Sequence, residues 1–238
     1  MYSNIKRQKQ INIGLIFILT FTLIFGSIGI YFSPAALADP LGKDMPQTPV
    51  KIKIPKAKKF PSKIKERIEL KSKRGSNYRQ FLEPDGSITA EIFQEPVFFK
   101  NKSGNWNEID NRLKQSGKSG FGFENSANKY KVFLGENGAS EKMAKFGTED
   151  HWVTFTPVTR DNVPGIIKEN TITYKNIQPN VDLKYQIGST FLKEEIVLNR
   201  NSGQNTFSFK LETKNLKYQE QEDGRILFTD SKTGEKIF

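Results

Sequence analysis

The stretch Val181-Asp-Leu-Lys-Tyr-Gln-Ile187 alternates strictly between apolar and polar side chains. Successive side chains of a β-strand point to opposite faces of a sheet, so this stretch predicts a strand with one apolar and one polar face. Such alternation is typical of antiparallel sheets that bury one face and leave the other in water. Phe207, Phe209 and Leu211 repeat the pattern further along the chain.

Similar short runs lie on both sides of this stretch, with turn residues such as Pro84-Asp85-Gly86 and Asp223-Gly224 between them. Further strands are expected at 88–92, 97–100, 106–109, 130–134, 152–158, 171–176, 191–198, 206–213, 216–219 and 226–230. Because no long helical period separates them, residues 78–238 predict a mainly β domain, an antiparallel β-sandwich or paired sheets. The final Gly234-Glu-Lys-Ile-Phe238 starts a strand that stops early, so we expect a domain truncated at its C-terminus.

The first 38 residues carry the features of an export signal. Lys6, Arg7 and Lys9 precede an uncharged, mostly apolar run from Ile11 to Phe32, expected as a helix. Ala36-Leu37-Ala38 then offers the small side chains that signal peptidase requires, with Asp39 following. We expect cleavage between Ala38 and Asp39, which places the mature chain outside the cytoplasm as a secreted or cell-surface protein.

A membrane anchor is the alternative interpretation of the same segment. The run from residue 11 to 32 is long enough to cross a bilayer, for which about 20 apolar residues suffice. Ser33-Pro34 and the cleavage site favour removal. In either case the positive end stays inside, so residues 39–238 are expected on the outer side.

The basic character of the chain is concentrated in one segment. The whole chain carries a net charge of +11, but residues 39–80 alone account for +9, while residues 81–238 are close to neutral at −1. We expect residues 39–77 to form an extended, disordered Pro/Lys-rich linker, because like charges repel and prolines stiffen the chain. Its interpretation stays open between a solvated spacer and a tether for anionic wall polymers. The expected contacts are Lys51, Lys53, Lys56, Lys58, Lys59, Lys63 and Lys65.

The sequence shows no recognisable catalytic or metal-binding pattern. It contains no cysteine, which excludes disulfides, thiolate catalysis and cysteine-based zinc sites. His151 is the single histidine and no second ligand pattern accompanies it, so we expect a solvated loop residue without a catalytic or metal role. Phosphate-binding, dinucleotide-binding and serine-hydrolase motifs are absent. No cofactor, no metal and no enzymatic activity are expected.

Two further groups of residues are candidates for a site. Glu194 and Glu195 are adjacent in a strand and therefore point to opposite faces, so they cannot form the carboxylate pair of a glycosidase. A second group consists of aromatic residues that could stack on sugar rings, although packing in the core is the favoured interpretation. Its members are Trp106, Trp152, Tyr174 and Tyr185.

An ordered set of segments resembles a known family. It comprises Glu91-Ile-Phe-Gln-Glu-Pro-Val-Phe-Phe-Lys100, Gly104-Asn-Trp-Asn-Glu-Ile-Asp-Asn-Arg-Leu113, Asn128-Lys-Tyr-Lys-Val-Phe133, Ile172-Thr-Tyr-Lys-Asn-Ile-Gln-Pro-Asn-Val-Asp-Leu183 and Leu192-Lys-Glu-Glu-Ile-Val-Leu198. In this order the segments resemble the N-terminal region of secreted, wall-associated YD-repeat (RHS-type) proteins of Gram-positive bacteria. The resemblance implies an exported β-rich module ahead of long repeats and, in some relatives, ahead of a C-terminal toxin. It supplies no catalytic residue, and no YD repeat occurs before residue 238.

Together these observations predict a non-enzymatic, exported cell-surface module that serves presentation, wall association or assembly. A carbohydrate-binding module and a hydrolase of wall polymers are the alternatives. The expected partners are anionic wall polymers and downstream YD repeats of the same protein. No nucleic-acid partner is expected. Contact with a membrane is expected only through residues 11–32, if that segment is not cleaved.

Overall fold

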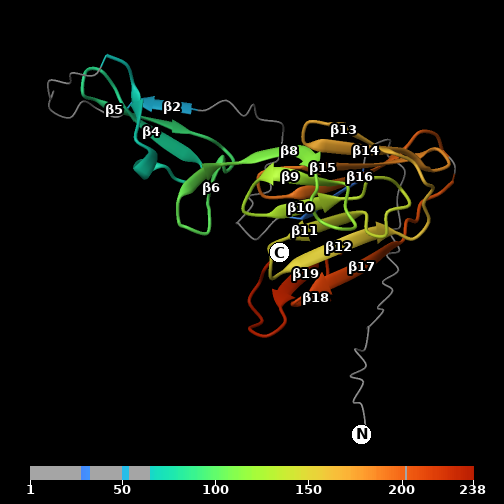
Figure 1. Ribbon diagram of the computed structural model, residues 1–238. Helices are drawn as coiled ribbons and strands as arrows, with labels where there is room; N and C mark the ends of the chain where they lie inside the picture. Colours follow the sequence, from blue (N-terminus) through green and yellow to red (C-terminus); the bar gives the residue numbers. More distant parts are fainter. Residues whose placement is uncertain (1–27, 33–49, 54–64, 202) are drawn as a thin grey trace, which may run out of the picture.

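The computed structural model describes residues 28–32, 50–53, 65–201 and 203–238, the first two ranges as backbone only. Figure 1 shows two large sheets packed together and a smaller sheet that extends to one side. All pairings between the described strands are antiparallel. The prediction of a mainly β, antiparallel fold is therefore confirmed.

Two sheets make up the larger part of the molecule. The five-stranded sheet has the order β1-β16-β15-β14-β13, with β1 (Ile28–Phe32), β13 (Gly165–Lys168), β14 (Thr171–Gln178), β15 (Val181–Ile187) and β16 (Leu192–Leu198). The six-stranded sheet has the order β17-β12-β11-β10-β9-β8, with β8 (Asp110–Gln115), β9 (Phe123–Ala127), β10 (Lys131–Leu134), β11 (Ala144–Gly147), β12 (Trp152–Pro157) and β17 (Phe209–Lys214). Most neighbouring strands are also consecutive in the sequence.

The core lies between these two sheets. The apolar side chains of β15 are at most 2% exposed, as the alternation in this strand predicts. They belong to one hydrophobic cluster with Val132, Phe146 and Val153 of the opposite sheet, so the two sheets form a sandwich. The hydroxyl of Tyr174 donates a hydrogen bond of 2.6 Å to the carbonyl oxygen of Gly135 and joins the layers directly.

A C-terminal hairpin closes one end of the core. Its strands are β18 (Leu216–Glu220) and β19 (Ile226–Asp230), joined by a turn in which Gly224 has a φ of 79°. Phe228 and Phe238 are buried, and the ring of Phe238 lies 5.3 Å from that of Phe146, between centroids. The hairpin is therefore part of the sandwich core.

The smaller sheet has the order β2-β5-β4-β3, with β2 (Val50–Lys53), β3 (Ile68–Glu69), β4 (Tyr78–Leu82) and β5 (Ile88–Ile92). A short 3-10 helix, η1 (Lys71–Lys73), follows β3, and a hairpin of β6 (Phe98–Lys100) and β7 (Trp106–Glu108) leads to the sandwich. Thus β2, β3 and η1 fall inside residues 39–77, where a disordered linker was expected. The pairing of β2 with β5 is a contact distant in sequence, which charge and proline content do not reveal.

The leader also differs from the expectation where the structure describes it. Residues 28–32, the end of the run expected as an apolar helix, form β1 and pair with the edge of β16. Residues 1–27 and the predicted cleavage residues Ala36, Ala38 and Asp39 lie outside the described residues. None of the helices in the described part of the chain is long and apolar enough to cross a membrane.

Candidate anion-binding face

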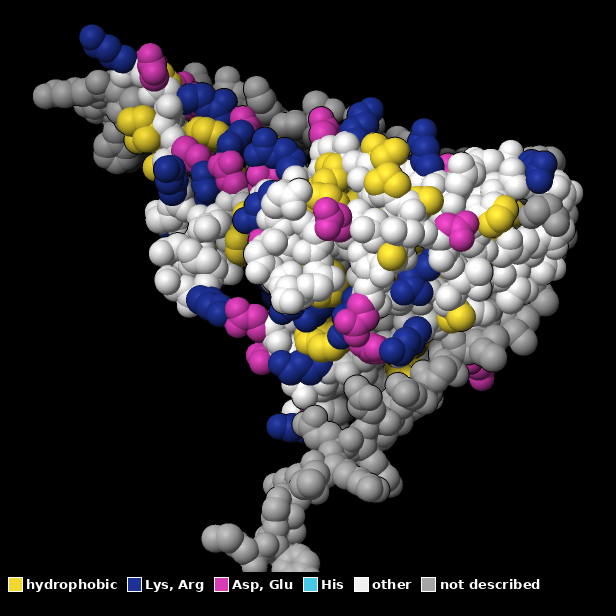
Figure 2. Space-filling view, turned by 45° about the vertical axis from the view of Figure 1, so that its right-hand side comes forward, with side chains coloured by type: hydrophobic (Ala, Val, Ile, Leu, Met, Phe, Trp, Pro, Cys, Tyr) yellow, Lys and Arg dark blue, Asp and Glu magenta, His cyan; other side chains and the backbone are white. Residues whose placement is uncertain are grey.

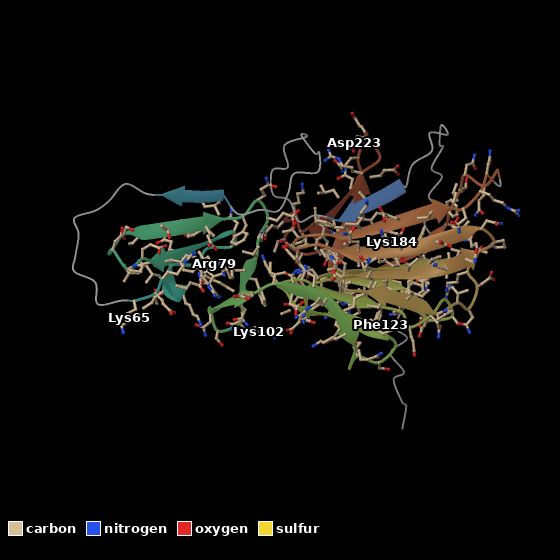
Figure 3. All side chains as sticks on the ribbon, turned by 90° about the horizontal axis from the view of Figure 1, so that it is seen from above. Lys65, Arg79, Lys102, Phe123, Lys184 and Asp223 are labelled. Atoms are coloured by element: carbon tan, nitrogen blue, oxygen red, sulfur yellow. The ribbon has the colours of Figure 1, made fainter. Side chains whose placement is uncertain are left out.

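The structure locates only some of the predicted tether lysines. Lys51 and Lys53 belong to β2, described as backbone, and Lys65 is exposed near β3 on the smaller sheet (Figure 3). The remaining predicted contacts lie outside the described residues; they are Lys56, Lys58, Lys59 and Lys63. Of the seven predicted contacts, Lys65 is the one whose side chain lies in the part of the chain that the structure describes.

The four predicted aromatic residues separate into two groups. Tyr174 and Tyr185 are 0% and 1% exposed and belong to the core, as the favoured interpretation predicts. Trp106 and Trp152 are both half-buried, and each lies close to a lysine. The ammonium nitrogen of Lys100 is 5.2 Å from the ring centre of Trp106. The four residues do not form a common platform.

His151 has a partner that sequence did not reveal. Its Nε2 atom lies 2.5 Å from Oδ2 of Asp230, at the end of β19. Backbone hydrogen bonds from Thr233, and next the contact with His151, hold the pKa of Asp230 well below its usual range. The histidine is half-buried and connects the turn before β12 to the C-terminal hairpin, so it is no free loop residue. In residues 65–201 and 203–238, no three His, Cys, Asp or Glu side chains are grouped for a metal ion.

Glu194 and Glu195 lie on opposite faces of β16. Glu194 pairs across the sheet with Tyr185, is 4% exposed, and has a pKa raised by burial to about 7. Glu195 makes ion pairs of 2.9 Å with Lys184 and 2.5 Å with Lys193. Its burial raises the pKa, but hydrogen bonds from these lysines outweigh that effect and leave the pKa lowered. The geometry agrees with the argument that the two carboxylates cannot act as a glycosidase pair.

The feature with the clearest binding chemistry is on the outer face of the six-stranded sheet. We define the lysine–aromatic face by four lysines and two aromatic residues: Lys118, Lys142, Lys145, Lys214, Phe133 and Trp152. Figure 2 shows lysine, hydrophobic and carboxylate side chains lying next to one another on one side of the molecule. The sequence analysis named Trp152 as an aromatic candidate but none of these four lysines.

Strand register brings these residues together. Phe133 of β10 pairs with Lys145 of β11, and Lys145 pairs with Thr154 of β12. In the next row Trp152 of β12 pairs with Lys214 of β17. Since neighbouring strands are about 4.8 Å apart, side chains of one row on the same face are in reach of each other.

The lysines pack closely against the aromatic rings. The ammonium nitrogen of Lys145 lies 4.1 Å from the ring centre of Trp152 and 5.7 Å from that of Phe133. The nitrogen of Lys118 is 5.1 Å from the Phe133 ring, and that of Lys142 is 5.8 Å from the Trp152 ring. These distances fit cation–π contacts, which hold each ammonium group over an aromatic face.

Lys145 is the most perturbed cation of the face. Burial, and next the positive charge of Lys118, lower its pKa to about 8, and Lys142 and Lys214 act in the same direction. Burial disfavours the charged form of a lysine, and like charges nearby disfavour it further. The arrangement is therefore a crowded positive cluster at the centre of a sheet.

Carboxylates neutralise only the margin of this cluster. Glu212 forms ion pairs with Lys142 at 3.2 Å and with Lys210 at 2.7 Å. Among the described residues no carboxylate lies within ion-pair distance of Lys118, Lys145 or Lys214. Lys214 donates a hydrogen bond of 3.2 Å to the carbonyl oxygen of Glu149, and the pKa of that carboxylate is lowered by a hydrogen bond from Lys102 and, to a smaller extent, by the charge of Lys214. Lys118 and Lys145 thus remain as ammonium groups without an ion-paired carboxylate among the described residues, which suits an anionic ligand.

The sequence contains a weak signal for this face. Lys145 stands between the buried residues Ala144 and Phe146, so it marks the outward position of a short strand. However, Lys118 and Lys214 are almost a hundred positions apart, and the net charge of residues 81–238 is −1. Only the pairing of strands shows that these lysines are neighbours.

Comparison with known proteins supplies a context. No family model and no solved structure matches the chain. The tRNA3(Ser)-specific nuclease WapA of Bacillus spizizenii is 32% identical over 210 residues, 82% of this chain and 9% of the relative. The tRNA nuclease WapA of Bacillus subtilis is 32% identical over 192 residues, 75% of this chain and 8% of the relative. The chain thus spans less than a tenth of these nucleases.

The alignment with a third relative extends over most of the length of that protein. The Wall-associated protein of Geobacillus stearothermophilus is 27% identical over 199 residues, 78% of this chain and 76% of the relative. The names of the nucleases overturn two predictions, the absence of enzymatic activity and the absence of a nucleic-acid partner. The shared similarity along most of the chain supports its assignment to a wall-associated protein family.

Proposed function

We propose that this chain is the exported, wall-associated β-rich part of a longer tRNA nuclease. The observation that carries wall association is the match along 76% of a protein named Wall-associated protein. The nuclease activity and its tRNA substrate are proposed for the longer protein, because the chain covers only 8–9% of the relatives that carry this name. Presentation at the cell surface is the role proposed for the part described here.

The architecture supports such a role. Exported proteins without cysteine depend on their hydrophobic core, and this chain has no cysteine and a continuous core between two sheets. Residues 39–80, which precede the sandwich in the sequence, carry a net charge of +9, which favours attraction to anionic wall polymers. Export through the leader, with cleavage before Asp39, belongs to the same proposal, as does a continuation into YD repeats.

Cell fractionation tests export and wall association. The full chain, produced in a Gram-positive host, is expected in the wall fraction and accessible to protease added from outside. A variant with Ala36→Lys and Ala38→Lys keeps the apolar segment but removes the small side chains of the cleavage site, and is expected in the membrane fraction. Recovery of the unmodified chain in the cytoplasm would contradict export, and its full release into the medium would contradict wall association.

The proposed nuclease continuation is tested separately. Sequencing the gene beyond codon 238 is expected to show an open reading frame that continues into repeats and a C-terminal nuclease. A stop codon at that point would contradict this part of the proposal. In that case incubation of the chain with total tRNA shows whether residues 1–238 cleave it themselves.

Carbohydrate binding is a second candidate function. It is favoured by Trp106 and Trp152, since both are half-buried rather than enclosed in the core. Substitution of each by Leu distinguishes the two functions. Loss of binding to a neutral wall glycan in either variant would support carbohydrate recognition, and unchanged binding would exclude these rings from it.

A further inference from the structure

We propose that the lysine–aromatic face is a binding site for a polyol-phosphate polymer, a chain of alternating polyol units and phosphodiesters. The proposal rests on the proposed function, because such a ligand is met on the outer side of the cell. It assigns a ligand class to Lys118, Lys145 and Lys214. These three lysines lie outside the basic segment of residues 39–80. It also separates two modes of wall attraction, one through residues 39–80 and one through a folded surface.

The geometry provides several donors along one surface. Lys145 and Lys214 extend from β11 and β17, on either side of β12, while Lys118 comes from the loop before β9. A linear polyanion that crosses β10, β11 and β12 can meet these ammonium groups one after another. Each lysine is a flexible point charge with three donors, which suits phosphates that are spaced along a flexible chain.

Repulsion between the lysines of the unbound face favours the binding of an anion. Lys118, Lys142 and Lys214 all disfavour the charged form of Lys145. A phosphodiester placed among them replaces repulsion between cations by attraction and favours protonation of Lys145. Binding is therefore linked to the uptake of a proton by this lysine.

A buried hydroxyl marks the centre of the same face. Thr154 lies directly across from Lys145 and Glu212, is 1% exposed, and its Oγ1 has no hydrogen-bond partner among the described residues. Buried polar atoms are nearly always hydrogen-bonded, so an unpartnered one requires an explanation. A phosphate oxygen that reaches between Lys145 and Trp152 would accept a hydrogen bond from this hydroxyl.

The chemistry favours a polyol phosphate over RNA. RNA recognition in single strands relies on bases stacked on open aromatic faces and on arginine. Here the cations of the face are lysines, and the rings of Phe133 and Trp152 are already covered by lysine side chains. A stacked base would have to displace these lysine side chains, whereas phosphates without bases need only the ammonium groups.

Titration of the full chain with synthetic poly(glycerol phosphate) tests the proposal, with binding followed by calorimetry and by Trp fluorescence. Lys145→Gln and Lys118→Gln are each expected to weaken binding about tenfold, as the loss of a charge-assisted contact does. Each substitution should also lower the slope of log affinity against log salt by about one. Lys118 is exposed in a loop, so its substitution tests the face even if Lys145→Gln perturbs folding.

Lys175→Gln is the matched control, because Lys175 is an exposed lysine on β14 of the other sheet. Its affinity is expected to equal that of the unmodified chain. Equal affinity of the Lys118→Gln and Lys145→Gln variants and the control would overturn the proposal. Tighter binding of single-stranded RNA with the same number of phosphates, and with the same lysine dependence, would overturn the ligand class. Wall association in cells that persists while this binding fails leaves the proposed function standing without this site.

The dependence of affinity on pH distinguishes direct binding by Lys145 from a purely structural role of this residue. The groups that face Lys145 are Lys118, Lys142 and Lys214, with Glu212 held by Lys142 and Lys210. Because the pKa of Lys145 is lowered to about 8, the affinity is expected to fall as the pH rises from 7 to 9. Lys145→Arg keeps its charge throughout this range and is expected to bind with little dependence on pH. The same fall in both proteins would show that Lys145 does not take up the proton.

Discussion

The sandwich and the smaller sheet of this molecule are stabilised in different ways. Figure 3 shows Lys184 on the sandwich and Arg79 on the smaller sheet, on opposite sides of the β6–β7 hairpin that carries Lys102. The sandwich encloses fully buried apolar side chains between two layers. Among the described residues the smaller sheet forms a single layer, without a second sheet packed on its face.

Charged side chains cover one face of the smaller sheet instead. Glu91 is 7% exposed and accepts hydrogen bonds from Arg67 at 3.0 Å and Arg79 at 2.8 Å. The guanidinium carbon of Arg67 lies 3.5 Å from the ring centre of Phe81, so the arginine also covers an aromatic ring. The comparison shows that a single-layered sheet can bury a phenylalanine under an arginine–carboxylate network. The alkyl part of an arginine side chain shields apolar surface while its charged group stays paired.

Phe146→Ala is expected to have the largest effect and to affect one region only. Phe146 is 1% exposed and contacts Tyr130 and Phe238, so truncation leaves a cavity in the sandwich. The expected loss of unfolding free energy is about 4 kcal/mol. Chemical denaturation measures it, and hydrogen exchange should show weaker protection in β11 and β12 but not in β4 and β5. Equal loss of protection in both regions would show that they unfold as one unit.

Glu194→Gln is expected to stabilise the sandwich at alkaline pH. Burial raises the pKa of Glu194 to about 7, above the ordinary value of 4.5, so the folded chain keeps a proton that the unfolded chain releases. Stability therefore falls as the pH rises from about 4.5 to 7 and stays low above it. The amide removes this cost, which is on the order of 3 kcal/mol at pH 8.

Glu195→Gln is the matched control for this substitution. Glu195 occupies the other face of β16, and its pKa is lowered. Its contribution is present above the unfolded pKa and is lost as the pH falls, so the two variants should change stability with opposite dependence on pH. A pH profile of unfolding by urea compares them. Identical profiles would contradict the burial of a neutral Glu194.

Glu91→Gln is expected to affect the smaller sheet and leave the sandwich unchanged. Burial would raise the pKa of Glu91, but hydrogen bonds from Arg79 and Arg67 outweigh it, and the pKa is lowered. The contribution of this carboxylate is thus present above its unfolded pKa and lost as the pH falls. Removing the charge is expected to weaken protection of β4 and β5 by about 2 kcal/mol in hydrogen exchange. Glu66→Gln, at an exposed position, is the control.

The sequence predicts the sandwich better than the smaller sheet for a physical reason. Strands that bury one face, such as 181–187 and 226–230, show the alternation directly and match β15 and β19. In contrast, β8 over Asp110–Gln115 consists mostly of polar residues, and β13 over Gly165–Lys168 is a short edge strand. Their pairing partners, rather than their own patterns, make them strands.

The lysine–aromatic face illustrates the same limit for sites. Trp152 was recognised as a candidate, but alternation cannot show that Lys145 lies over its ring. Charge summed along the chain pointed to residues 39–80, where lysines are neighbours in sequence. The sandwich assembles its own cluster from residues that are distant in sequence, because register across strands, and not composition, places them side by side.

His151→Gln is expected to have the smallest effect and sharpens the comparison at the junction of the sandwich with its C-terminal hairpin. The imidazole Nε2 contacts Asp230 at 2.5 Å, and the carboxylate also accepts backbone hydrogen bonds from Lys232 and Thr233. Those bonds remain in the variant, so a fall in Tm of only about 2 °C is expected. Asp230→Asn should lower Tm further, since it weakens all three contacts. The difference between the two variants measures the contribution of the backbone hydrogen bonds from Lys232 and Thr233. An unchanged Tm for His151→Gln would restore the interpretation of His151 as a solvated loop residue.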